Sequence, residues 1–178
     1  MGRMVALLRG INVGGRVLPM AELRVLCTEL GWEDVRTYIQ SGNVIFSASG
    51  KSEALESSLE KAIEERFGMK VSTIMRTAAQ WRDILDSNPF PETARETPNW
   101  LLLMVGKSAP PGGIEAAMEA TGQDGEQVRS AGGILWLSYP AGVGQSRMVW
   151  PKKFEGEPFV ATTRNFRTAL KLKELLEA

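Results

Sequence analysis

The stretch TYIQSGNVIF, Thr37–Phe46, decides the fold of the first half of the chain. Residues 35–40 and 43–48 are rich in β-branched and aromatic side chains, which favour strands. The pair Gly42-Asn43 lies between them and is typical of a two-residue hairpin turn. The stretch therefore predicts two antiparallel strands joined by a tight turn.

Two helices and two further strands are predicted around this hairpin. The apolar run at residues 4–8 is typical of a buried strand. Apolar residues three and four apart predict helices over residues 20–30 and 52–67, and a glycine follows each helix. Residues 70–76 predict a fourth strand. The resulting order, β-α-β-β-α-β over residues 1–77, predicts a ferredoxin-like domain.

The second half predicts a smaller α+β domain, residues 100–178. A helix at 78–87 and a loop with three prolines at 88–99 are expected to form the connecting segment, residues 78–99. The second domain is expected to contain a strand at 100–106, a helix near 113–120, strands at 127–130 and 134–138, an amphipathic segment ending near residue 154, and a final helix at 164–176. No fourth strand is predicted there, and no sequence repeat relates the two halves.

The composition excludes several classes of functional site. The 178 residues include 21 basic and 21 acidic side chains, no histidine and one cysteine, Cys27. A histidine-based catalytic triad, a histidine-ligated metal site and an internal disulfide are therefore impossible. Zero net charge also differs from the basic surface expected of a protein that binds duplex nucleic acid. We expect no metal or cofactor, and we expect Cys27 to be a buried thiol on the apolar face of its helix.

A glycine-rich loop follows the first predicted strand, in the sequence LLRGINVGG, Leu7–Gly15. In the predicted topology the end of strand one and the turn between strands two and three lie at the same edge of the sheet, where the first helix also begins. A glycine-rich loop, a helix N-terminus and a cation at one edge are typical of an anion site. The loop lacks both the Gly-Lys-Ser/Thr ending of a Walker loop and the dinucleotide fingerprint. Alternatively, the glycines only allow tight turns, which leaves Arg9 unexplained.

Two stretches of the second half repeat this combination of small residues and a cation. SYPAGVGQSRM, Ser138–Met148, predicts a strand, a glycine-rich loop and a helix. ATTRNFRT, Ala161–Thr168, predicts a helix with Thr162 or Thr163 as N-cap and with a cation in its first turn. The residues predicted to bind a ligand between the two halves are Arg9, Asn12, Gly14, Gly15, Ser41, Gly42, Asn43, Ser146, Arg147, Arg164 and Asn165.

Five separated blocks carry a family resemblance over nearly the whole chain. They are ALLRGINVGG with the following Met20–Leu23, TYIQSGNVIF, the NPF of Asn88–Phe90, YPAGVGQSRM and TTRNFRT. In these blocks the sequence resembles the bacterial family known as domain of unknown function 1697. One departure is Arg147, where the family usually has Lys. The resemblance implies an α+β fold with a ferredoxin-like first part, and it implies no activity and no catalytic residue.

The favoured hypothesis is that the protein binds a small ligand containing a phosphate or a nucleotide; whether it is an enzyme stays open. One alternative is a nucleic-acid binding module whose sheet stacks bases on Tyr38 and Phe46. Another is a structural or interaction protein, in which Arg9 would pair with an internal carboxylate. No signal peptide or membrane-spanning stretch is evident, so we expect a cytoplasmic monomer or homodimer without a membrane partner.

Overall fold

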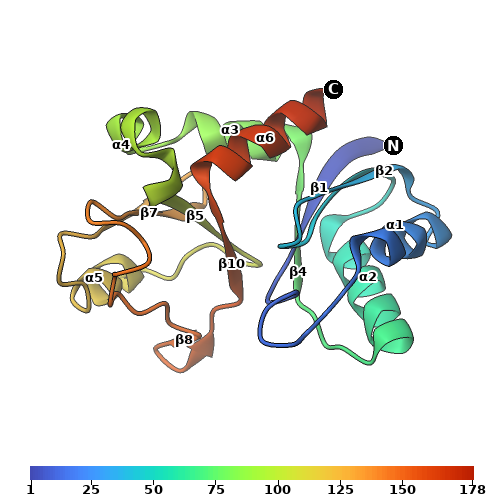
Figure 1. The fold of residues 1–178 in the computed structure, drawn as a ribbon, viewed down its shortest axis with the longest axis horizontal. Helices are drawn as coiled ribbons and strands as arrows, with labels where there is room; N and C mark the ends of the chain where they lie inside the picture. Colours follow the sequence, from blue (N-terminus) through green and yellow to red (C-terminus); the bar gives the residue numbers. More distant parts are fainter. The chain divides into compact units, whose positions relative to one another are not determined.

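Two four-stranded sheets, each with its own helices, form the computed structural model, which describes all residues from 1 to 178 (Figure 1). The chain divides into two units. The first unit contains Met1–Trp81 and Leu172–Ala178, and the second contains Arg82–Lys171. Two helices, α3 (Ala78–Asp86) and α6 (Phe166–Glu177), contribute residues to both units.

The first unit has the predicted order of elements. Its strands are β1 (Gly2–Leu8), β2 (Glu33–Tyr38), β3 (Asn43–Ala48) and β4 (Thr73–Thr77), and its helices are α1 (Met20–Glu29) and α2 (Ser52–Phe67). The strand order in the sheet is β2-β3-β1-β4, and all neighbouring strands are antiparallel. Strand β3 therefore lies between β1 and β2, as the sequence predicted for a split βαβ arrangement.

The central strands of the first sheet, β1 and β3, are buried on both faces, whereas the edge strand β2 is largely exposed. Alternate residues of β1 point to opposite faces: Met4, Ala6 and Leu8 join α1 and α2 in one apolar core, where the rings of Trp32 and Phe46 stack with centroids 4.0 Å apart. The residues that point to the other face include Val5, Leu7, Ile45 and Ile74, which are fully buried. Accessible polar groups near these central strands therefore lie at strand ends and in loops.

The hairpin turn of the first unit is longer than predicted. It spans Ile39–Gly42, and Asn43 is the first residue of β3 rather than part of the turn. The buried Asn43 side chain donates from Nδ2 to Tyr38 O at 2.9 Å and to Ser41 Oγ at 3.1 Å, so it bridges the turn from inside. Gly42 and Ile39 take positive φ values of 85° and 52°.

The second unit contains more strands than predicted. Its strands are β5 (Leu101–Gly106), β6 (Gln127–Ala131), β7 (Ile134–Ser138), β8 (Lys153–Phe154), β9 (Glu157–Pro158) and β10 (Ala161–Asn165), and its helical elements besides α3 and α6 are α4 (Pro91–Glu96), η1 (Pro98–Trp100) and α5 (Ile114–Glu119). The main sheet has the order β10-β5-β7-β6 and is antiparallel throughout; β8 and β9 form a separate pair. The amphipathic segment predicted to end near residue 154 contains no helix.

A fourth strand occupies the place where the last helix was predicted to begin. Ala161–Asn165 pairs with β5 as β10, so Arg164 lies in a strand and not in a helical turn. Asn165 is the residue that caps α6, because its Oδ1 accepts the Thr168 N–H at 2.8 Å. The prediction of Thr162 or Thr163 as N-cap was therefore wrong.

The predicted proline-rich loop also contains a helix, α4. Pro91 is its first residue, a position that proline favours because its N–H would have no helical partner there and its φ is already helical. Pro91 therefore marks a helix start within the segment 88–99, for which the sequence predicted only a loop.

Both units have the same strand order. Numbered within its own unit, each sheet reads fourth, first, third, second strand. In the first unit α2 connects the third and fourth strands, whereas in the second unit the irregular segment 139–160 with β8 and β9 makes this connection. The similarity lies in topology, which explains why no sequence repeat reveals it.

One edge strand of each sheet is covered by carboxylates from a neighbouring helix. In the first unit, Glu56 Oε1 accepts the Met75 N–H and Glu60 Oε1 accepts the Thr73 N–H, both at 2.7 Å. The two glutamates are one helical turn apart on α2, and the two N–H groups are two residues apart on β4. Helix and strand periodicities match at this spacing, so α2 satisfies two outward N–H groups of the edge strand.

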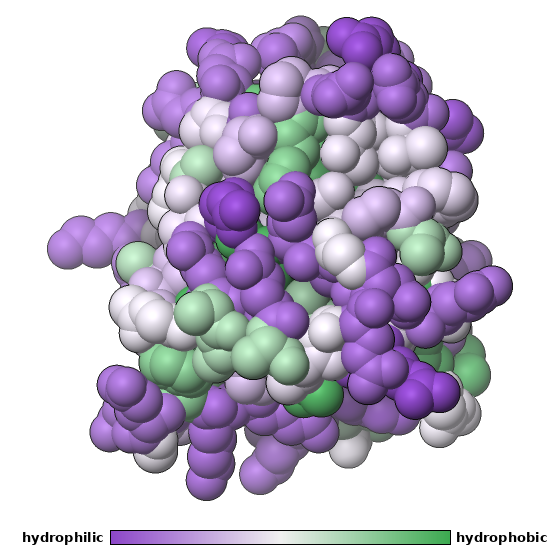
Figure 2. All heavy atoms as spheres, turned by 90° about the vertical axis from the view of Figure 1, so that its left-hand side faces the viewer, coloured by the Kyte–Doolittle hydropathy of each residue, from purple (hydrophilic) through white to green (hydrophobic).

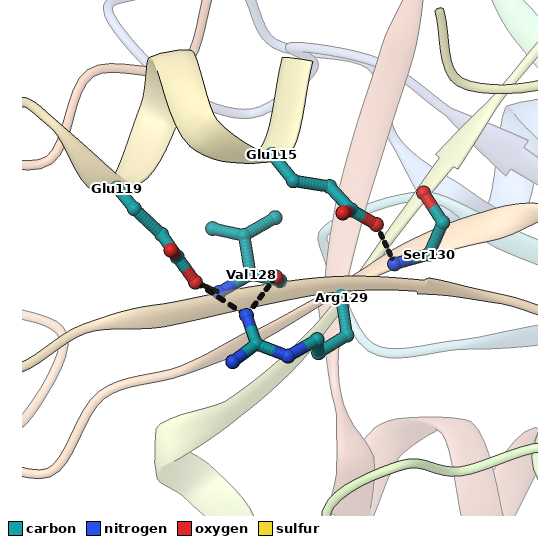
Figure 3. Close-up of polar contacts among 5 residues, drawn as sticks. All are labelled: Glu115, Glu119, Val128, Arg129 and Ser130. Atoms are coloured by element: carbon teal, nitrogen blue, oxygen red, sulfur yellow. Dashed lines mark hydrogen bonds and ion pairs between the residues drawn. The ribbon is translucent and has the colours of Figure 1, made fainter. Parts of the chain in front are cut away.

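The second unit uses the same device on β6. Figure 3 shows Glu115 and Glu119 of α5 directed at this edge strand, where Glu119 Oε1 accepts the Val128 N–H at 2.7 Å and Glu115 accepts the Ser130 N–H. Arg129 Nη1 adds an ion pair to Glu119 at 2.6 Å. Exposed strand edges invite pairing with other chains, and in each unit one edge is blocked by charge and hydrogen bonding together.

Candidate functional site

The loop after β1 meets the β2–β3 turn at one edge of the first sheet. The Leu8 N–H donates to Gly42 O at 2.9 Å, and Asn12 Nδ2 donates to Gln40 O at 2.7 Å. The structure thus brings these two segments together as the sequence predicted. Whether a ligand binds there stays a prediction.

Arg9 pairs with Ser72 on one side and faces the turn that contains Ser41 on the other. Its N–H donates to Ser72 O at 2.9 Å, which continues the pairing of β1 with β4 by one residue. On the other side, the pairing of β1 with β3 ends at Leu7 and Asn43, and extending its register by two residues, into the β2–β3 turn, puts Ser41 opposite Arg9. Residues directly opposite in antiparallel strands point to the same face with Cβ atoms roughly 5 Å apart. We refer to Ser41, Arg9 and Ser72 as the Ser–Arg–Ser row.

The Arg9 side chain has no partner in the protein. It is partly buried, and its guanidinium forms no hydrogen bond or ion pair with any other residue of the chain. The internal carboxylate that a structural role for Arg9 was expected to use forms no ion pair with it. A partly buried cation without a counter-charge is unfavourable, so an anion at this position would stabilise it.

Asn12 holds the loop in place. Its Nδ2 donates to Leu18 O at 3.1 Å and to Gln40 O at 2.7 Å, and its Oδ1 accepts the Leu18 N–H at 2.8 Å. Because both amide hydrogens are used by backbone carbonyls, Asn12 positions the loop and has no donor left for a ligand. Its φ of 54° is in the left-handed region, which asparagine tolerates better than most residues.

The remaining first-unit candidates shape the backbone. Gly42 is tightly enclosed: a Cβ there would lie 2.5 Å from Ile11 Cδ1 and 2.9 Å from Leu8 Cβ. Gly14 and Gly15 also have positive φ, but no atom lies within 4 Å of their Cβ positions. Gly42 therefore allows close packing of the two segments, whereas Gly14 and Gly15 leave an open stretch of backbone.

In the second unit, Ser146 is engaged with Glu126. The Ser146 hydroxyl donates to Glu126 Oε1 and its Oγ accepts the Met148 N–H at 3.1 Å, while Glu126 Oε2 accepts the Asp124 N–H at 2.8 Å. The hydrogen bond from Ser146 is the main reason that the pKa of Glu126 is lowered. These bonds fix the loop after β7, and the neighbouring Arg147 is exposed.

Arg164 and Asn165 lie on β10, at the opposite edge of the second sheet from Glu126, which directly precedes β6. Three strand spacings, roughly 14 Å, separate these two edges. Arg164 is buried and donates from Nη1 to Thr162 Oγ1 at 2.9 Å and to Thr163 O at 2.8 Å. Burial lowers its pKa to about 10. The second-unit candidates thus occupy two separate places.

Figure 2 shows the side of the molecule on which α4 and α5 appear in Figure 1. Hydrophilic residues cover most of it and interrupt smaller hydrophobic areas, so this view shows no continuous apolar face. The exposed large hydrophobic residues of the second unit are Trp100, Val149, Trp150 and Leu170.

None of the helices combines the length and apolarity needed to cross a bilayer.

A cavity of about 260 Å³ opens next to the row and was not predicted. Its lining residues are Glu60, Glu64, Lys70, Val71 and Ser72. Ser72 belongs to both the cavity and the row, and the adjacent Arg16 donates from Nη2 to Lys70 O at 2.6 Å. No local signal marks Ser72 in the sequence, because its proximity to Arg9 depends on the long-range pairing of β1 with β4.

Phe46 is not available for the base stacking that the nucleic-acid hypothesis assigns to it. Phe46 was expected to stack bases on an open sheet, but it is fully buried and stacks on Trp32. Tyr38 is the only one of the two aromatic residues with exposed surface. A base-stacking platform needs aromatic side chains on an open sheet face, and the central strands β1 and β3 of this sheet are buried on both faces.

The fold and the edge site define a small α+β protein built from two antiparallel sheets. The model of a family described as "Protein of unknown function (DUF1697)" matches residues 1–136. The chain belongs to this family, as its motifs implied.

A solved structure supports the fold. The structure of a conserved bacterial protein from Streptococcus pneumoniae is similar with a TM-score of 0.71 and 22% sequence identity, and the match covers 98% of each chain. At this identity the similarity shows the fold alone. No curated protein matches the sequence.

Proposed function

We propose that the protein binds a small phosphate-containing anion at the Ser–Arg–Ser row. The observation that carries this proposal is the partly buried Arg9 guanidinium, which has no partner in the protein and belongs to the sheet edge where Ser72 and the turn with Ser41 also lie. An arginine guanidinium binds phosphate through two parallel charge-assisted hydrogen bonds. Adjacent hydroxyls add neutral donors, so the row matches the donors that a phosphate needs.

The loop after β1 supplies further donors. The N–H groups of Gly10, Ile11, Val13, Gly14 and Gly15 donate to no group of the protein. Positive φ values at Gly10, Asn12 and the two following glycines turn the backbone repeatedly. Successive N–H groups in such turns form concave anion sites. The loop then leads into α1, whose first turn has no side-chain cap and therefore favours negative charge.

The second unit provides an internal comparison. Lys107 follows β5 as Arg9 follows β1, and its N–H donates to Val160 O at 2.9 Å as the Arg9 N–H donates to Ser72 O. The residue beside Lys107 in the pairing of β5 with β10 is Val160, whereas the pairing of β5 with β7 ends earlier, at Met104 and Leu135. Val160 has no hydroxyl group. Of two topologically equivalent positions, one therefore has a hydroxyl beside its cation, which supports a specific role for the Ser–Arg–Ser row.

The identity of the ligand beyond its phosphate, and the contribution of Ser146, Arg147, Arg164 and Asn165 to its binding, stay predictions from the sequence. Ser146 would have to exchange its hydrogen bond with Glu126. Arg147 is exposed and needs no such exchange.

Calorimetric titration with orthophosphate at low ionic strength tests the proposal. We expect saturable binding to the unaltered protein and loss of at least about ten-fold in affinity for Arg9→Ala, because a charge-assisted hydrogen bond contributes roughly 1.5–3 kcal/mol. Ser72→Ala should lose less. The matched control is Arg167→Ala, which removes an equal charge from an exposed position on α6.

Two results would overturn the proposal. The first is no detectable binding of orthophosphate by the unaltered protein. The second is an equal loss of affinity in the Arg9 and Arg167 variants, which would show that only net charge matters. Circular dichroism of each variant checks that folding is retained.

A further inference from the structure

The face of the first sheet opposite α1 and α2 carries both Arg9 and Tyr38. Strand pairing places Tyr38, Asn43 and Leu7 in one row across β2, β3 and β1, and neither Asn43 nor Leu7 belongs to the apolar core shared with the two helices. Residues in such a row point to the same face, and so do residues two apart on one strand. Arg9 follows Leu7 by two residues, and its N–H still pairs with the strand β4 side of the sheet. Arg9 and Tyr38 therefore point to the same face.

The separation of Tyr38 from Arg9 suits a ligand larger than an inorganic ion. Strand β2 is two strand spacings from β1, which is roughly 10 Å, and the step from the row of Tyr38 to Arg9 along β1 is two residues, roughly 7 Å. The two Cα atoms are therefore roughly 12 Å apart, and both side chains are long. A ligand that contacts both side chains must hold its phosphate and its second group apart, as the sugar of a nucleotide does.

The Tyr38 side chain has no polar or aromatic partner in the protein. It is partly buried, its ring stacks on no other aromatic ring, and its hydroxyl forms no hydrogen bond; only the backbone O of Tyr38 is engaged, by Asn43 Nδ2. Arg36, two residues earlier and on the same face, is exposed and forms no ion pair. The two carboxylates of β2, Glu33 and Asp34, lie at the other end of the strand. The cation nearest to Tyr38 along β2 is thus also available to an anionic ligand.

We infer that the ligand is a free nucleoside 5′-monophosphate, an inference that rests on the proposed function. Its phosphate would lie against Arg9 and its base would stack on Tyr38. Every base has a π-face that stacks on an aromatic side chain, and a single accessible ring serves a single base. A strand of nucleic acid would bring further phosphates, which need a basic surface, whereas the chain has zero net charge.

The test compares orthophosphate, ribose 5-phosphate and adenosine 5′-monophosphate by calorimetric titration. The last two share the sugar phosphate and differ in the base. We expect the unaltered protein to bind adenosine 5′-monophosphate roughly ten-fold more tightly than ribose 5-phosphate, the factor for one stacked base. Tyr38→Ala should abolish this preference and leave the affinity for ribose 5-phosphate unchanged. Tyr38→Phe keeps the ring and loses the hydroxyl, so this matched control should retain the preference.

The outcomes separate this inference from the proposed function. Equal affinity for the two sugar phosphates, or a preference that persists in Tyr38→Ala, overturns the nucleotide inference while phosphate binding stands. Tighter binding of a 5′-phosphorylated oligoadenylate than of adenosine 5′-monophosphate also overturns it, because the site would then take a strand. If none of the probes binds, the proposed function fails and this inference fails with it. A preference lost in Tyr38→Ala and kept in Tyr38→Phe supports both.

Discussion

Gly42 is the residue at which the loop after β1 and the β2–β3 turn come closest. We predict that Gly42→Ala lowers the free energy of unfolding by about 2–4 kcal/mol, because the new Cβ would clash with Ile11 and Leu8 and because φ is 85°. Denaturant unfolding measures the change. Gly14→Ala is the control: its φ is also positive, but no atom is near the new Cβ, so we expect only about 1 kcal/mol. Equal losses would contradict the packing argument.

Cys27 should make stability depend on alkaline pH. Burial raises the pKa of its thiol to about 12 from a usual value of 9.0. Between these values the unfolded state binds fewer protons than the folded state, so stability present below pH 9 is lost as pH rises. We predict that Cys27→Ala removes about 1.4 kcal/mol of the loss between pH 8 and pH 10, the value of one pKa unit. Identical pH profiles of the two proteins would contradict a buried thiol.

At the residue scale, the sequence predicted which segments meet better than it predicted what their side chains bind. The meeting of the loop after β1 with the β2–β3 turn followed from topology alone. The hydrogen bonds that engage Asn12 and Ser146 could not be predicted, because their partners Gln40 and Glu126 are 28 and 20 residues away in the chain. Side-chain roles of this kind depend on the packing of segments that only the folded chain brings together.

At the element scale, the carboxylates on the edge strands are the feature common to both units. We predict that Glu119→Ala destabilises the protein by about 1–3 kcal/mol, because it leaves the Val128 N–H without its partner. Glu119→Gln keeps an oxygen acceptor and loses only the ion pair with Arg129, so it should cost less. Chemical denaturation measures both. Equal effects of the two variants would show that charge alone matters.

Removing both carboxylates from β6 tests their effect on association. The double variant Glu115→Ala, Glu119→Ala exposes two edge N–H groups, and we predict concentration-dependent oligomers in sedimentation experiments, because open strand edges pair. The control is Glu53→Ala, which removes a charge at an exposed position of α2. A double variant that stays monomeric at all concentrations would contradict this role.

The start of α6 shows why elements were misassigned in the second half. A Thr-Thr pair before a helix is typical of a cap, and the pairing that makes it a strand is with β5, about 60 residues earlier in the chain. We predict that Asn165→Ala costs about 1 kcal/mol of stability and Thr163→Ala costs less, since Asn165 is the cap. Thermal unfolding distinguishes the two variants. A larger loss of stability for Thr163→Ala than for Asn165→Ala would support Thr163 as the N-cap instead.

At the scale of the whole molecule, the end of the chain completes the first unit. Leu172–Ala178 belongs to this unit, and Arg3 Nη2 donates to Leu175 O at 2.8 Å. Leu172 is fully buried, whereas Leu170 is 46% exposed. We predict a loss of about 2–5 kcal/mol for Leu172→Ala and under about 0.5 kcal/mol for Leu170→Ala, measured by denaturant unfolding. Similar losses would contradict this assignment of α6.

The shared strand order of the two units has a consequence for how the protein can evolve. Because the positions beside Arg9 and Lys107 are equivalent in topology but carry different side chains, selection for a ligand would act on the first row and leave the second free to drift. Random mutagenesis scored for folding alone should therefore accept substitutions of Ser72 about as readily as those of Val160. Scored for ligand binding, the same library should reject the serine changes. Two units with the same strand order therefore allow one unit to acquire a binding site while the other contributes only to the fold.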